Sequence, residues 1–101
     1  MKRMGMKITL KPEEVERMCR ELDGYLHDAE QALCANQIKT HCDASGLAST
    51  ISEANAILMA VLNDEKQRDE NRECVAKMES LSEIATRLHG RVQELSISLN
   101  Q

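Results

Sequence analysis

The sequence predicts a mostly all-α fold, either an antiparallel helical bundle or a long helical hairpin, and two observations support this. Residues 51–62, ISEANAILMAVL, contain a run in which Asn55 is the one polar residue from Ala54 to Leu62. Amphipathic segments with apolar residues spaced by three and four lie before and after it. Because a helix that is apolar on every side is buried on every side, the middle stretch needs partners on more than one face.

The chain of 101 residues is expected to form a single domain, 1–101, that opens with a basic arm. The arm, residues 1–11, has four Lys or Arg residues and no acid. Met6, Ile8 and Leu10 alternate with polar residues, which suggests a short β-segment at 6–10. Pro12 then begins a helix, since proline suits the first helical position.

The first helix is expected near residues 12–42. Its apolar stripe stays in phase across Gly24, so the helix should continue, with Asp23-Gly24 as the expected kink. A turn cluster at 43–46 should end it by Cys42. The stripe comprises Val15, Met18, Leu22, Tyr25, Ala29 and Ala32.

The second helix is expected near residues 48–62. Thr50 and Glu53 have capping-box spacing, although Leu47 and Ala48 fit an earlier turn of the same helix. The apolar run at 51–62 is too short to cross a bilayer, which takes roughly 20 apolar residues.

Residues 63–73, NDEKQRDENRE, contain no apolar side chain and leave two alternatives. Their composition favours a solvated helix, which would give a hairpin whose second helix runs from about Ser49 to the C-terminus. The apolar stripes on either side differ in phase by one residue, about 100° of rotation, which favours a break and three helices. We expect the break.

The last helix is expected at 66–90 or on to residue 99, because its apolar residues keep a regular heptad spacing typical of a coiled coil. The final residues leave an alternative open, since Leu95, Ile97 and Leu99 alternate with serines. A helix that ended at Gly90 would allow a β-segment at 95–99, although a continued helix is favoured. The heptad positions are Cys74, Met78, Leu81, Ala85, Leu88, Val92, Leu95 and Leu99.

Residues with metal-binding or catalytic chemistry form no assembled site in the sequence. His27, Cys34 and His41 recur every seven residues on one stripe of the first helix. That spacing rises about 10.5 Å, too far for one zinc ion in one chain. They are therefore weak metal candidates that only symmetry between copies would bring together. Without a phosphate loop or a positioned nucleophile, we expect no enzyme and no cofactor.

The sequence predicts a non-catalytic protein-interaction module, such as an inhibitor, chaperone or adaptor subunit, that is acidic and forms a homo-oligomer. The alternative is an oligomeric small-ligand or metal-binding protein with a site formed across subunits. The predicted interface comprises Leu58, Val61, Leu62, Met78, Leu81, Leu88, Val92 and Leu95. The predicted charged partner face comprises Glu13, Glu14, Glu16, Lys2, Arg3 and Lys7.

Charge and cysteine usage narrow the expected partners and location. A net charge of -4 argues against nucleic acid or an anionic membrane as the partner, because both need a basic face. Four cysteines with no secretory signal ahead of the first helix are expected to be reduced thiols, which indicates a cytoplasmic protein. The partner is therefore expected to be another protein.

Overall fold

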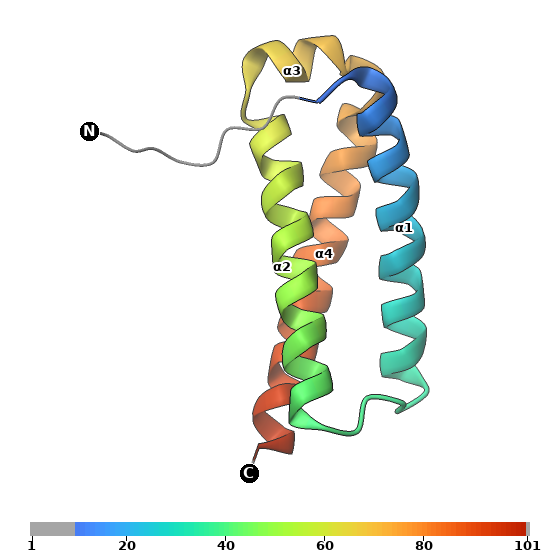
Figure 1. Ribbon diagram of the computed structural model, residues 1–101, viewed down its shortest axis with the longest axis vertical. Coiled ribbons are helices and arrows are strands. Elements are labelled where there is room, and N and C mark those ends of the chain that lie inside the picture. The colour runs from blue at the N-terminus through green and yellow to red at the C-terminus, as the bar shows by residue number, and fades with distance from the viewer. Residues whose placement is uncertain (1–9, 101) are drawn as a thin grey trace, which may run out of the picture.

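The computed structural model describes residues 10–100, and this part of the chain forms four helices that pack against each other, without a strand (Figure 1). The all-α prediction is confirmed. The predicted β-segment at 6–10 lies outside the described residues except for Leu10, which is in no strand. The helices are α1 (Pro12–Cys34), α2 (His41–Leu62), α3 (Glu65–Glu70) and α4 (Arg72–Leu99).

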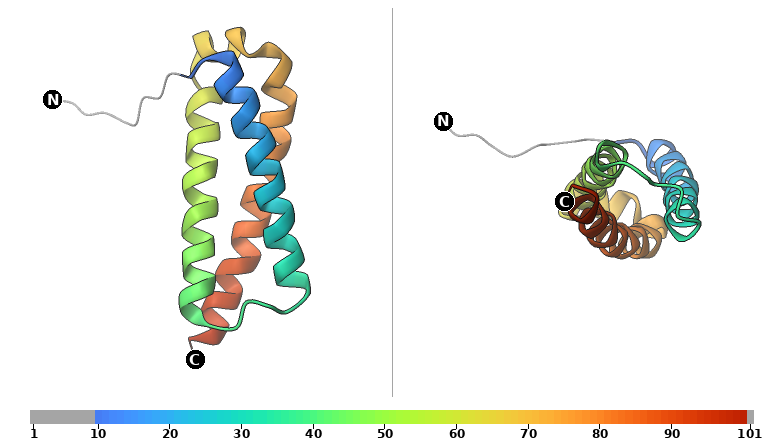
Figure 2. Two further views of the ribbon diagram at one scale, coloured as in Figure 1. Left: turned by 45° about the vertical axis from the view of Figure 1, so that its right-hand side comes forward. Right: turned by 90° about the horizontal axis from the view of Figure 1, so that it is seen from below.

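The three long helices lie side by side, with α1 and α4 running in the same direction and α2 in the opposite one (Figure 1). The short α3 crosses the end of the molecule at which α2 finishes and α4 begins. α2 packs along α4, whereas α1 packs mainly on α4 and touches α2 little. Seen from the end in Figure 2, α2 and α4 are adjacent and α1 stands further out.

α1 begins at Pro12 as predicted but ends at Cys34, eight residues before the predicted end at 42. Asn36 adopts the left-handed conformation with φ 58°, which asparagine tolerates better than most residues. Gln37 N–H then donates to Ala32 O at 2.9 Å and Asn36 N–H to Leu33 O at 3.2 Å, the bonds of a Schellman ending. α1 runs through Gly24 as a single helix.

α2 begins at His41, seven residues before the predicted start at 48. The Thr40 side chain accepts a hydrogen bond from Asp43 N–H at 3.1 Å and so caps the helix. Thr50 is not a cap, because its hydroxyl donates to Gly46 O within the helix. By length and composition alone, this 22-residue helix would also suit a membrane, but core helices of soluble proteins pass the same test.

Residues 63–73 form neither an open loop nor part of an unbroken helix. Asn63 and Asp64 separate α2 from α3, and Asn71 separates α3 from α4. The Asp64 carboxylate accepts from the N–H groups of Lys66 and Gln67, which starts α3. The expected break is therefore real at 63–64, and the short helix α3 follows it with Asp64 as its cap.

α4 continues through Gly90 to Leu99, so the β-segment considered at 95–99 is wrong. Leu95 and Leu99 pack against the core, as their heptad positions require. Ile97 falls on the outer face and is 58% exposed. The heptad spacing therefore predicts the helical structure of these residues correctly, whereas the alternation of apolar residues with serines does not indicate a strand.

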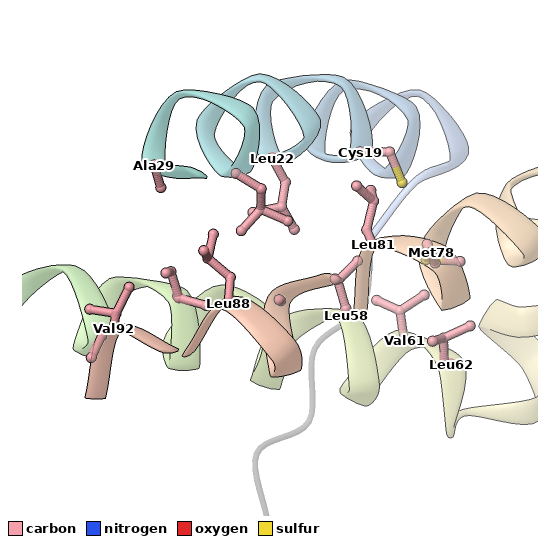
Figure 3. Close-up of a cluster of buried hydrophobic side chains, with 14 of the residues drawn as sticks. Cys19, Leu22, Ala29, Leu58, Val61, Leu62, Met78, Leu81, Leu88 and Val92 are labelled. Carbon is pink, nitrogen blue, oxygen red and sulfur yellow. The ribbon is translucent and has the colours of Figure 1, made fainter. Parts of the chain in front are cut away.

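The core lies between α1, α2 and α4, and Figure 3 shows side chains from all three helices directed into it. The run at 54–62 is not buried on every side as expected, because Ala56 and Met59 are exposed. α4 covers one face of α2 along the helix and α1 touches α2 little, so part of this run stays open. The largest fully buried side chains are Leu26, Ile51, Leu58, Met78, Leu81, Val15, Val61 and Val92.

Candidate docking groove

A shallow apolar groove of about 250 Å³ lies between α1 and α2, on the side where these two helices stand apart. Since both helices pack on α4, the surface between them is left without a covering element in residues 10–100. Glu21 and Thr50 also line the groove. Its apolar lining consists of Met18, Leu22 and Tyr25 from α1 and of Ala54 and Ile57 from α2.

The groove's lining follows from helical spacing on each wall. Met18, Leu22 and Tyr25 are separated by four and three residues and so lie on one face of α1. Leu22 is buried and forms the floor, whereas Met18 and Tyr25 are half-buried. On α2, Ala54 and Ile57 are half-buried as well. The two stripes therefore give the groove apolar surface on both walls.

One carboxylate, that of Glu21, lines the groove, and α1, which carries it, is an acidic helix. The sequence of α1 carries seven acidic residues and two arginines, and α2 adds Asp43 and Glu53 with no Lys or Arg. On the side facing α4, Asp23 pairs with Lys77 at 3.3 Å, and Glu30 similarly pairs with Arg91 at 3.6 Å. Among the described residues Glu21 has no such ion pair, so the groove keeps a negative rim.

The predicted interface residues are brought together inside a single chain. Seven of the eight are buried in its core, and Leu95 is half-buried against them. They pack as heptad positions of α4 and inward positions of α2, and of the eight only Leu95 keeps part of its surface exposed. Of the predicted charged face, Glu13, Glu14 and Glu16 are exposed on α1, while Lys2, Arg3 and Lys7 lie outside the described residues.

The three weak metal candidates do not share one helix. His27 and Cys34 are exposed on α1, whereas His41 is the first residue of α2, because α1 ends earlier than expected. His41 Nδ1 lies 2.9 Å from both the carbonyl oxygen and the hydroxyl of Ser96 on α4. Across residues 10–100, no group of three His, Cys, Asp or Glu side chains is placed to hold a metal ion.

The four cysteines differ in their surroundings. Cys34 and Cys42 are exposed, Cys74 is half-buried, and Cys19 is buried as a core residue. Burial raises the pKa of the Cys19 thiol above its ordinary value; nearby Cys74 adds to this, and Lys77 opposes it. Cys19 therefore stays protonated and acts as a small apolar side chain.

Comparisons with protein-family models, with curated proteins and with solved structures found no match. The apolar stripe of α1 predicts Met18 and Tyr25 as core residues, whereas both line the groove. A signal was present, because the apolar side of α1 is wider than one neighbouring helix covers. Val15, Cys19 and Leu26 fill the core, and Met18 and Tyr25 flank them.

Proposed function

We propose that this protein is a non-catalytic protein-binding module whose α1–α2 groove takes an amphipathic helix of a partner with Lys or Arg beside its apolar face. The groove carries the proposal, because it combines a largely half-buried apolar lining with the exposed carboxylate of Glu21 on an acidic helix, α1. Binding a helix in such a trough is a recurring mode of recognition, read through apolar residues spaced by three and four. The partner helix would complete an antiparallel bundle that α1, α2 and α4 leave open.

Each part of the groove supports a different aspect of recognition. Met18 is flexible and polarizable, and so adapts to differently shaped partner side chains. Tyr25 supplies a rigid ring of the kind enriched among residues that dominate binding energy. Glu21 and the net negative charge of α1 favour basic partners mainly through the association rate. An inhibitor, chaperone or adaptor subunit in the cytoplasm would use such a surface, with no cofactor, nucleic acid or membrane involved.

The expected homo-oligomer is a separate proposal. The groove does not favour a second copy, since α1 of that copy would bring its negative charge toward Glu21 and the acidic α1. A contact between copies would instead use exposed apolar residues such as Met59, which is 39% exposed, and Ile97. Sedimentation equilibrium tests it, and a species of 11.4 kDa at tens of micromolar would contradict it.

The second candidate function, a metal or small-ligand site across subunits, rests on His27 and Cys34. Both are exposed on α1, so symmetry-related copies could bring them together. Zinc should then raise the oligomeric state of the native chain, and His27→Ala should abolish the effect. A monomer with or without zinc would remove this candidate.

Affinity capture followed by binding measurements on a purified partner tests the main proposal. Ile57→Ser removes an apolar side chain from the groove, whereas Met59→Ser makes a similar change on the same helix outside it. We expect Ile57→Ser to weaken binding about tenfold and Met59→Ser to leave it nearly unchanged, with both variants folded by circular dichroism. Equal affinities would contradict docking in the groove.

A further inference from the structure

The basic arm joins the described part of the chain at Leu10, beside the open end of the α1–α2 groove. Leu10 is half-buried, packs against the core, and donates its N–H to Gln67 Oε1 at 2.7 Å. Together with Pro12 at the start of α1 and Asp64 just after α2, it lines one hollow. Figure 2 shows the chain entering α1 on the side of α1 and α2 away from α4, which is the side of the groove.

The part of the arm before Leu10 is long enough to reach along the groove. An extended chain covers about 3.3 Å per residue, which puts Ile8 about 7 Å and Met4 about 20 Å from Leu10. A helix rises about 1.5 Å per residue, so Met18 lies about 9 Å and Tyr25 about 20 Å from the start of α1. An extended arm that turned back along α1 would therefore span the apolar wall that this helix gives the groove.

The composition of the arm complements the groove. Residues 1–9 contain three Lys or Arg side chains and no acid, whereas the groove has the carboxylate of Glu21 on the acidic α1. Met4, Met6 and Ile8 are spaced by two, so they share one face of an extended segment. That face would pack on the apolar lining of the groove while the basic side chains stay in water near the carboxylates of α1.

We propose that residues 1–9 occupy the α1–α2 groove of their own chain and compete there with the partner. This inference rests on the proposed function and adds regulation to it. A segment tethered beside a site has a high effective concentration there, so it fills the site even when its own affinity is modest. A partner then binds with an apparent affinity lowered by the fraction of chains whose groove is filled by the arm.

Nuclear Overhauser contacts in the full chain test the position of the arm directly. Tyr25 is the one tyrosine, so its ring protons are identified without ambiguity, and methyl labelling of Met and Ile makes the arm visible. We expect contacts from the Tyr25 ring to the Met4 methyl, assigned through Met4→Leu, and from Ile8 to Met18. Isotope-filtered spectra of mixed labelled and unlabelled chains should show neither contact, because each lies within one chain.

Competition with a designed amphipathic helix, whose Leu face is flanked by Lys and Arg, tests the regulation by calorimetric titration. The arm variant carries Lys2→Gln, Arg3→Gln and Lys7→Gln. The control variant has the same net charge and carries Lys39→Gln, Lys66→Gln and Arg87→Gln, at exposed positions outside the groove. We expect the arm variant to bind the helix about tenfold tighter than the control, as for an arm that fills about nine-tenths of the grooves.

Three results would overturn the inference. One is the absence of both arm contacts from the NMR spectra. Another is their presence in the isotope-filtered spectra, which would place the arm of a second copy in the groove. The last is equal affinity of the arm and control variants for the helix, a result that leaves the proposed function intact. A helix that binds neither variant contradicts the proposed function instead, and the NMR contacts still decide the position of the arm.

Discussion

The side-chain Oε1 of Gln67 accepts a hydrogen bond from the backbone N–H of Leu10 at 2.7 Å. Gln67 is 2% exposed and lies on α3, while Leu10 precedes α1 by two residues. The bond joins segments 57 residues apart and ties the entry of α1 to the corner between α2 and α4. A stretch without apolar residues thus holds one end of the molecule together.

Replacing Gln67 with Leu should destabilise the protein by about 1–3 kcal/mol, because Leu10 N–H would lose its acceptor at a partly buried site. Gln93→Leu makes the same chemical change on an exposed position of α4 and should shift stability by only about 0.5 kcal/mol. Urea unfolding of both variants measures the difference. Equal midpoints for the two would show that the bond contributes nothing.

Leu88→Ala and Ile97→Ala should have very different effects although both shorten an apolar side chain on α4. Leu88 is 3% exposed in the core, so its truncation should cost about 2–5 kcal/mol. Ile97 is 58% exposed, and its truncation should cost under about 1 kcal/mol. Thermal unfolding checks both values. A large loss from Ile97→Ala would instead indicate that this side chain is buried, as in an oligomer.

His41→Ala should lower stability by about 1 kcal/mol, because His41 Nδ1 lies 2.9 Å from both Ser96 O and Ser96 Oγ. A hydrogen bond forms with either tautomer of His41, because Nδ1 with a proton donates to the Ser96 carbonyl and Nδ1 without one accepts from the Ser96 hydroxyl. His27→Ala, at an exposed position of α1, is the matched control and should have little effect. Chemical denaturation of the two variants at one pH makes the comparison, and equal losses would count against the contact.

The thiols should react with iodoacetamide in the order of their exposure and thiolate content. At pH 8, Cys34 and Cys42 should be modified quickly and Cys19 last, because burial raises the pKa of Cys19 and the thiolate is the nucleophile. Mass spectrometry of timed samples gives the order. Modification of Cys19 as fast as Cys42 in the folded protein would contradict its placement in the core.

The raised pKa of Cys19 makes the free energy of unfolding depend on pH. Below the ordinary thiol pKa of about 9.0, Cys19 is protonated in both the folded and the unfolded chain. Above it the unfolded chain ionises first, so stability falls as the pH rises toward the higher pKa of the folded state. The slope of unfolding free energy above pH 9 should therefore be less steep in Cys19→Ala than in the wild type.

The sequence predicts the helical class and the α4 core because heptad periodicity is a local signal with a direct physical meaning. It does not predict where α1 ends. The ending is formed by Asn36 in a left-handed conformation, which is more often occupied by glycine and is therefore harder to recognise at an asparagine. The early start of α2 was readable, because Thr40 and Asp43 have the same capping spacing as Thr50 and Glu53. The burial of Gln67 could not be predicted from the local sequence, because its hydrogen-bond partner, Leu10, is 57 residues away.

The sequence shows that the apolar side of α1 is wide, but not which part of that side lines a groove. Whether an apolar stripe faces a neighbour or an open trough depends on how far apart two helices stand. Met18 and Leu22 have similar local patterns, yet Leu22 is buried and Met18 is half-buried. That difference follows from α1 packing on α4 rather than on α2, a property of the assembled fold.

Fluorescence of Tyr25 tests the central claim most directly. The chain has no Trp or Phe and one Tyr, and that residue lines the groove, so its emission reports occupancy of this site alone. The titrants are two designed amphipathic helices without aromatic residues, which share one Leu face and carry either Lys and Arg or Glu beside it. The account predicts a saturable change with the basic helix, weakened by Ile57→Ser, and little change with the acidic one. No change with either helix, or the same change with both, would contradict it.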